Sequence, residues 1–240
     1  MRDNEWIEVA YIFDRNISKN EFRELFEGFE RYLRSGSADD EITDSYYRGD
    51  DYIGHYSDAL SAAINNNESF QVELPFRGFN PYLGTGDALL SSVPHVSVSE
   101  TIHPFTKPDT EELLREIRKR RRTFTDALSV VAEILEPMWV FGDKGGLAIG
   151  EDMSVKELAS AIEPPLYEYN LFRQETVKHI GRERVLNAPA WRVEELDTGA
   201  VFLVVGEPPM RYRGLIEERE AVADHLGLSV AETTKYYPDE

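Results

Sequence analysis

The chain has 240 residues, of which 41% are hydrophobic and 30% charged, so it is long enough and apolar enough to bury a substantial core. Acidic residues outnumber basic ones by 45 to 26, and the resulting formal net charge of −19 disfavours binding of the whole molecule to DNA or to an anionic membrane. The chain has no cysteine, which excludes disulfides, thiolate metal sites and a cysteine nucleophile.

The basic residues are strongly biased toward arginine, since 19 Arg and 7 Lys make up the 26. Carboxylates hold water and cations at high salt, where a Debye length of about 3 Å at 1 M screens their mutual repulsion. The N-terminus has no apolar leader, and no run approaches the roughly 18 apolar residues of a membrane span. These features predict a protein of the salt-rich cytosol of a halophile; an ordinary acidic protein of a mesophile is the alternative.

The first predicted elements are a strand and a helix. Residues 6–13 are rich in β-branched and aromatic residues, which favours a strand. A capping box that begins at Ser18 opens a helix with one apolar face, and this helix ends at 35–37. The acidic, tyrosine-rich stretch 39–51 shows no period and is expected to be a surface loop.

The middle of the chain combines short strands with one long helix. The long helix is capped at 109–112 and carries apolar residues at helical spacing to about Leu135. The other expected elements are a short helix at 55–64, strands at 70–74, 95–99 and 138–141, a loop at 78–86 and a tight turn at 142–146.

The order strand, helix, strand, strand, helix, strand over 6–141 predicts an α+β fold. It suits an antiparallel or mixed sheet with helices packed on one face, in which the N-terminal part is ferredoxin-like. The stretch 36–69 is a long insert in that pattern.

A break at Pro164-Pro165 marks the expected boundary between an α+β sandwich over 1–163 and a C-terminal extension over 164–240 that packs on the same core. Before the break, a capping box at Ser154 opens a short helix. The extension is expected to contain a helix at 171–186, a β-hairpin whose turn is 197–199, and a helix at 215–226. The second hairpin strand is apolar on both faces, which predicts a buried strand inside the sheet.

Two His-x-Ser triplets are candidate catalytic residues. Paired triplets of this kind, each on a strand, are typical of 2H phosphoesterases, in which one imidazole acts as base, the other as acid, and the hydroxyls hold phosphate. Only the second triplet lies on a predicted strand, and such short patterns also arise by chance. The four residues are His55, Ser57, His95 and Ser97.

One strongly basic run occurs in the middle of the long helix. It could contact phosphate, a nucleic acid or an acidic surface, which would make the protein a nucleic-acid accessory protein. The alternative is a solvated helix face whose charges are compensated by acidic neighbours. The run is Arg118, Lys119, Arg120, Arg121 and Arg122.

The stretch 39–52 combines carboxylates with tyrosines, which suits recognition of a basic protein because aromatic side chains anchor interfaces and carboxylates meet Arg and Lys. A salt-adapted surface loop is the alternative. No His, Asp or Glu spacing indicates a metal site, and no motif indicates a cofactor. The candidate partner-binding residues are Asp39, Asp40, Glu41, Asp44, Tyr46, Tyr47, Asp50, Asp51 and Tyr52.

Residues 170–207 contain Phe172-Arg173-Gln174, the run His179 to Leu186, Pro189-Ala190-Trp191 and the hairpin that follows. This layout resembles a group of uncharacterised haloarchaeal proteins and, more distantly, immunity proteins of the Imm52 type from polymorphic-toxin systems. The resemblance implies an α+β fold and a role as a non-catalytic toxin antidote. The leading hypothesis is therefore a non-enzymatic binding protein that recognises a basic protein partner.

Overall fold

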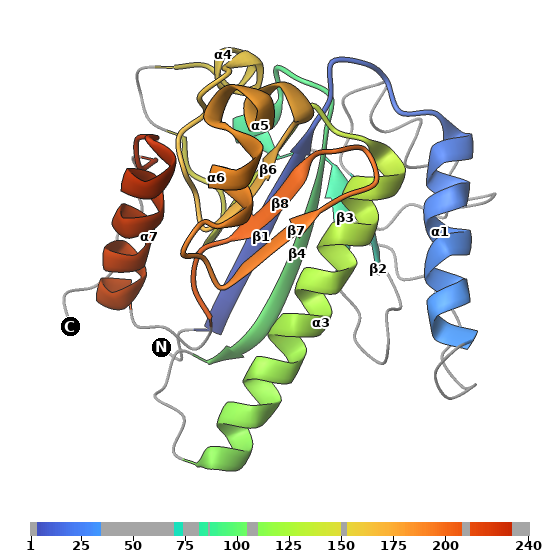
Figure 1. The fold of residues 1–240 in the computed structure, drawn as a ribbon. Helices are drawn as coiled ribbons and strands as arrows, with labels where there is room; N and C mark the ends of the chain where they lie inside the picture. The colour runs from blue at the N-terminus through green and yellow to red at the C-terminus, as the bar shows by residue number, and fades with distance from the viewer. Residues whose placement is uncertain are drawn as a thin grey trace.

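The computed structural model describes residues 4–34, 70–73, 82–85, 87–104, 110–149, 153–207 and 212–231 (Figure 1). Within these ranges, eight strands form one sheet in the order β2-β3-β4-β1-β5-β6-β8-β7, and all neighbouring strands are antiparallel. The strands are β1 (Asn4–Ile12), β2 (Phe70–Glu73), β3 (Tyr82–Thr85), β4 (His95–Pro104), β5 (Trp139–Lys144), β6 (Tyr169–Phe172), β7 (Arg192–Glu195) and β8 (Val201–Val204). The helices are α1 (Lys19–Arg34), the 3-10 turn η1 (Ala88–Leu90), α3 (Glu111–Leu135), α4 (Val155–Ser160), α5 (Gln174–Ile180), α6 (Arg182–Leu186) and α7 (Tyr212–Leu226).

The N-terminal part has the predicted ferredoxin-like arrangement, but its second strand is β3 and not the predicted strand at 70–74, which forms the edge strand β2. The neighbours β3-β4-β1-β5 form its four-stranded sheet, in which β1 and β4 are central and each helix connects strands that are not adjacent. Both α1 and α3 pack on one face, where Phe22, Leu25, Phe124 and Leu128 join Val9 in one buried cluster. The α+β class with an antiparallel sheet is confirmed.

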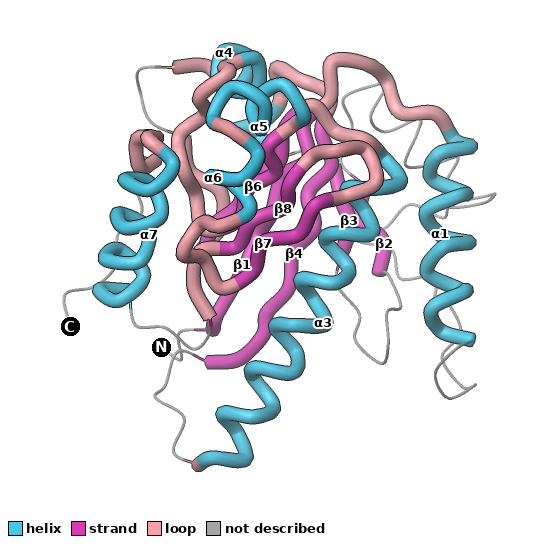
Figure 2. Tube along the Cα trace, in the orientation of Figure 1, coloured by secondary structure: helices cyan, strands magenta, loops and turns pink. Residues whose placement is uncertain are grey.

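The helices after β5 cover the opposite face of the sheet, so both faces carry helices rather than one. Leu158 of α4 packs against Phe141, and Val222 of α7 belongs to a cluster with Phe172 and Leu203. In Figure 2, α3 and α7 flank the strands from opposite sides. Because β6 pairs with β5, the C-terminal strands extend the same sheet; the domain boundary at 163/164 itself stays a prediction.

Two strands lie where the sequence predicted other structure. β3 lies inside the predicted loop 78–86, and its Leu83 is buried opposite Val98 of β4. β6 includes the first residues of the predicted helix 171–186, and the rest of that segment forms α5 and α6, which meet at Gly181 with a φ of 104°. In both strands, pairing with buried neighbours outweighs the local sequence signal.

β5 continues through Gly142 to Lys144, although the sequence predicted a turn over 142–146. A Cβ atom at Gly142 would lie 2.6 Å from Cγ2 of Val9, so glycine is required for β5 to approach β1 here. The turn follows at Gly145 and Gly146, whose φ angles are 83° and 96°.

The C-terminal hairpin has the predicted form. Its turn is closed by a 2.8 Å hydrogen bond from the backbone N of Gly199 to the carbonyl of Leu196, and Gly199 has a φ of 76°. β8 lies between β6 and β7, and all four of its residues are buried, as its apolar composition predicted. The predicted loop at 39–51 and helix at 55–64 lie outside the described residues.

Candidate functional site

Four buried charged side chains form two neighbouring ion pairs at one end of the central strands. They are Arg121 of α3, Glu168 just before β6, Asp143 of β5 and Arg219 of α7. Their exposed fractions are 1%, 2%, 3% and 6%, although such residues are almost never fully buried unless they are paired. We refer to these four residues as the ion chain.

Arg121 enters the ion chain from the α3 face of the sheet. It lies on the buried stripe of α3, between Ile117 and Phe124, so its guanidinium points toward the strands rather than into solvent. Its Nη2 donates a hydrogen bond to Oε1 of Glu168, and its Cζ lies 5.0 Å from the centre of the Tyr169 ring. The ring face adds a favourable interaction with the cation.

Arg219 enters the ion chain from the opposite face. It precedes Val222 by three residues and Leu226 by seven, so it lies on the buried stripe of α7. Its Nη2 donates a 2.6 Å hydrogen bond to Oδ1 of Asp143, which also accepts from the backbone N of Lys144 at 3.2 Å.

The strand register brings the two carboxylates together. Gly142 pairs with Tyr169, so the next position places Asp143 opposite Glu168, and a 2.9 Å bond from Val205 N to the Glu168 carbonyl holds this position in the sheet. Like charges on opposite residues of neighbouring strands destabilise a sheet. Here an arginine from each helix layer compensates one carboxylate, and the formal charges of the ion chain sum to zero.

Burial changes the ionisation of this region. Loss of solvent raises the pKa of Asp143 to about 6; the charge of Arg219 opposes this shift, and the charge of Glu168 adds to it. Tyr167, which lies near Asp143 and Arg219, also has a raised pKa because it is buried and close to the Asp143 carboxylate. Asp143 is therefore mainly ionised at neutral pH and is protonated under mildly acidic conditions.

The ion chain links secondary structure elements and is not arranged for contact with a substrate. All four side chains are buried, so they cannot reach a ligand at the surface. Through them α3 on one face is connected to α7 on the other across β5 and β6. A buried carboxylate that loses its arginine would remain charged in a low-dielectric environment, which costs several kcal/mol.

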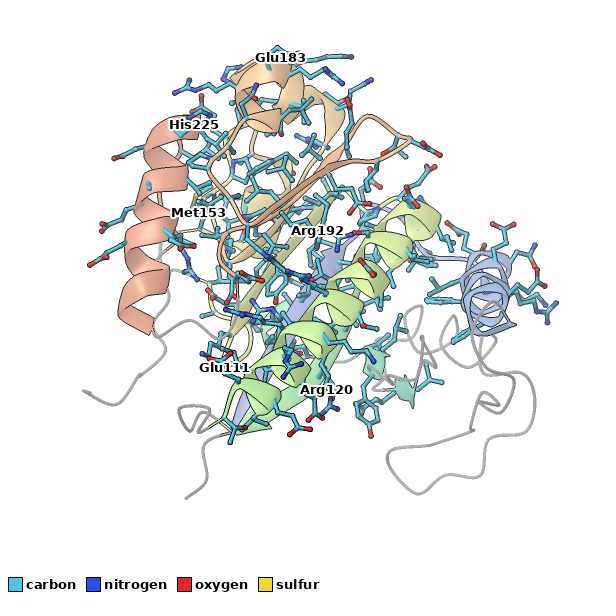
Figure 3. All side chains as sticks on the ribbon, turned by 60° about the horizontal axis from the view of Figure 1, so that its bottom comes forward. Glu111, Arg120, Met153, Glu183, Arg192 and His225 are labelled. Carbon is cyan, nitrogen blue, oxygen red and sulfur yellow. The ribbon has the colours of Figure 1, made fainter. Side chains whose placement is uncertain are left out.

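Within the basic run on α3, Arg121 belongs to the ion chain and the other residues do not. Arg121 is buried, whereas the neighbouring arginines lie nearer the surface and contact carboxylates of the protein. Arg120 lies 3.7 Å from Glu100, and Arg122 and Arg118 lie 3.0 and 4.0 Å from Glu207. Figure 3 shows Arg120 on the N-terminal half of α3. Lys119 is exposed on the same half.

His95 is the first residue of β4, which confirms that the second His-x-Ser triplet lies on a strand. The imidazole is buried; its Nε2 accepts a 3.2 Å hydrogen bond from the backbone N of Asp87, and its Nδ1 lies 3.0 Å from the carbonyl of Val93. Burial lowers its pKa, so the neutral ring donates from Nδ1. Ser97 is half-buried on the same strand.

Several sequence-predicted residues lie outside the described part of the chain. His55 and Ser57 do, so their pairing with His95 and Ser97 stays a prediction. The acidic candidates 39–52 do as well. Among the described residues, no three or more His, Asp or Glu side chains are grouped so as to hold a metal ion. None of the described helices is long and apolar enough to span a membrane.

No protein-family model matches the chain, and no curated protein sequence is significantly similar to it. Among solved structures, the T6SS protein PA0821 of Pseudomonas aeruginosa is similar at 10% sequence identity, with a TM-score of 0.47. The alignment covers 91% of this chain and 73% of that one. Neither a haloarchaeal family nor the Imm52 type is supported by these comparisons.

The sequence reasoning missed the ion chain, although part of its signal was present. Within 118–122, Arg120 and Arg121 both lie three or four residues from Ile117 and Phe124, so helical phase places both beside the apolar stripe, and the structure buries Arg121. That phase indicates a buried arginine and therefore a buried carboxylate partner. The identity of the partner depends on strand register, which the local pattern did not provide.

Replacement of Arg121 should destabilise the protein far more than replacement of its neighbour Arg122. Arg121→Met leaves Glu168 buried without its guanidinium partner, and we expect the free energy of unfolding to fall by about 3–5 kcal/mol. Arg122→Met removes a surface ion pair and should cost no more than about 1 kcal/mol. Urea denaturation of both variants tests this, and equal losses would contradict the burial of Arg121.

Asp143 should make the stability depend on pH in the acidic range. Its pKa in the folded protein, about 6, lies above the ordinary value of 3.8, so the folded state binds more protons between these values. The free energy of unfolding should therefore fall as pH rises from about 4 to about 6, by roughly 3 kcal/mol for this group.

The variant Asp143→Asn should lack this contribution, so its stability relative to the unchanged protein should rise with pH across that interval. Denaturation midpoints measured between pH 4 and 7 provide the comparison. Glu112→Gln, which neutralises an exposed carboxylate on the first turn of α3, controls for the loss of one charge. A pH profile of Asp143→Asn that runs parallel to that of the unchanged protein would show that the group titrates normally.

Proposed function

We propose that this protein is a binding protein of the immunity or antidote type that recognises a basic protein partner in a salt-rich cytosol. The supporting observation is an imbalance in how its charges are used. Many arginines of the described residues contact acceptors of the protein itself, whereas carboxylates are in large excess over cations in the sequence. A partner that approaches the surface therefore meets uncompensated negative charge.

Many arginines of the described residues contact a carboxylate or a carbonyl of the protein. Arg192 of β7 contacts both Asp126 and Glu194 at 2.6 Å and lies beside α3 (Figure 3). Arg184 donates to the backbone carbonyl of His225. Other arginines with a carboxylate contact are Arg15, Arg118, Arg120, Arg121, Arg122, Arg173, Arg182 and Arg219.

The carboxylates exceed the cations by 45 − 26 = 19. Exposed examples occur on the first turns of α3, at Glu111, Glu112 and Glu116, and near the hairpin, at Glu133 and Asp197. The charges of Asp197 and Glu194 also help to raise the pKa of Glu133, after the effect of its partial burial. Such a surface offers carboxylates for direct ion pairs with a cationic protein and disfavours contact with nucleic acid.

The stretch 39–52 is the proposed contact, because this short segment combines its carboxylates with three tyrosines and one arginine. Tyrosines supply apolar contact area and carboxylates pair with Lys and Arg of the partner. At molar salt, long-range attraction is screened, so the aromatic contacts and direct ion pairs must supply the affinity. The resemblance of 170–207 to immunity proteins also favours an antidote role.

The other two functions have weaker support. A phosphoesterase would require His95 to face a shared substrate, yet its ring is buried and both nitrogens have backbone neighbours. A nucleic-acid protein would require the basic run, yet Arg121 is buried and Arg118, Arg120 and Arg122 contact carboxylates.

The test is capture of a partner by the full tagged chain from a lysate of its source organism in molar KCl, followed by affinity measurement with the purified partner. We expect a stoichiometric partner of basic isoelectric point. Neutralising Asp39, Asp40 and Glu41 together (Asp39→Asn, Asp40→Asn, Glu41→Gln) should raise the Kd at least about tenfold, or 1.4 kcal/mol.

The matched control neutralises three exposed carboxylates of α3, through Glu111→Gln, Glu112→Gln and Glu116→Gln. It removes the same charge, so a long-range effect of net charge would weaken binding equally in both variants. Failure to retain any protein, retention of an acidic partner, or equal losses in the two variants would each count against the proposal.

A further inference from the structure

The ion chain contains two carboxylate oxygens whose hydrogen-bonding capacity is not used by the described residues. Oδ1 of Asp143 accepts from Arg219 and from the backbone of Lys144, and Oε1 of Glu168 accepts from Arg121. The second oxygens, Oδ2 of Asp143 and Oε2 of Glu168, are buried and have no hydrogen-bond partner among those residues. Buried polar atoms are almost always paired, so both atoms require an explanation.

The two atoms belong to neighbouring positions. Continuation of the β5–β6 register beyond the Gly142–Tyr169 pair places Asp143 opposite Glu168, the residue that precedes β6. The charge of Glu168 acts on the Asp143 carboxyl and raises its pKa, as expected of neighbouring groups. The arginines approach from the two helix layers and engage the other oxygen of each carboxylate. The unused acceptors are thus two anionic oxygens from adjacent strands, both in the interior.

The chemistry of these acceptors selects the ligand. Two adjacent acceptors require a molecule that can donate two hydrogen bonds in different directions and is small enough for the interior. A water molecule meets both requirements. A metal ion is not favoured, because no group of three or more ligating side chains occurs among the described residues and two arginines already balance the carboxylates.

We propose that a buried water molecule bridges the two carboxylates, donating one hydrogen bond to Oδ2 of Asp143 and one to Oε2 of Glu168. With this water in place each carboxylate keeps its arginine, and the repulsion between the two anions is screened at close range. The link from α3 to α7 then runs through five members: guanidinium, carboxylate, water, carboxylate and guanidinium.

Two measurements on the unchanged protein test the site directly. A high-resolution crystal structure should show a peak within about 3 Å of both oxygens. Oxygen-17 magnetic relaxation dispersion should count that molecule among the waters that exchange slowly with bulk solvent. Absence of the peak would overturn the proposal, and this result does not depend on how any variant folds.

The double variant Arg121→Met with Glu168→Met tests the bridging role. It removes one anchor of the water together with the arginine that pairs with it, so no buried charge is left unpaired and the count of slowly exchanging waters should fall by one. The control Asp126→Asn removes a carboxylate that pairs with Arg192 near the surface, and its count should equal that of the unchanged protein.

Two outcomes would contradict the proposal in this second test. An unchanged water count in the double variant, with the variant folded, would show that no water bridges the pair. An infrared band of a protonated carboxylic acid at neutral pH that disappears in Asp143→Asn would show that the two oxygens share a proton instead of a water.

Discussion

The central constraint on this structure is the burial of two neighbouring carboxylates, Asp143 on β5 and Glu168 just before β6. Without cationic partners, the two carboxylates would repel each other and would also lose their hydration. Either effect would destabilise the fold by more than a surface ion pair stabilises it. The sheet tolerates Asp143 and Glu168 because an arginine reaches each of them, one from α3 and one from α7. The position of α3 is therefore tied to Glu168, just before β6, and that of α7 to the neighbouring Asp143 of β5.

This constraint connects the two parts of the chain. The ferredoxin-like part supplies β5 and α3, and the later part supplies β6 and α7, so each half contributes one carboxylate and one arginine. The hydrophobic clusters on the two faces provide most of the stabilisation but are not directional. The ionic contacts add direction, because a guanidinium satisfies a carboxylate only in a narrow geometry.

The arginines and the carboxylates of this protein have different roles. Arginines such as Arg192 and Arg219 serve the internal structure, while the excess carboxylates remain for solvent, salt or a partner. Arginine suits this role better than lysine because its planar group stays charged and binds carboxylates through several donors. A bias toward arginine in the composition is thus also a consequence of how the layers are joined.

Those features that depend on local pattern were predictable from the sequence. Local sequence determines several features within a few residues, so they could be predicted. They are the capping boxes at Ser18 and Ser154, the apolar stripe of α3 and the burial of β8. β3 and β6 were missed because neighbouring strands, rather than their own sequence, stabilise them. The ion chain was missed for the same reason: the contact between Arg219 and Asp143 spans 76 residues and depends on where α7 lies.

The most direct test of this account is a double-mutant cycle between Arg121→Met and Arg219→Met, measured by denaturation at a salt concentration where all four proteins fold cooperatively. The two arginines approach from opposite faces and engage different carboxylates. If the ion chain couples them, the loss in the double variant should differ from the sum of the single losses by more than about 0.5 kcal/mol. Additivity within that margin would show that α3 and α7 are held independently, and would contradict the account.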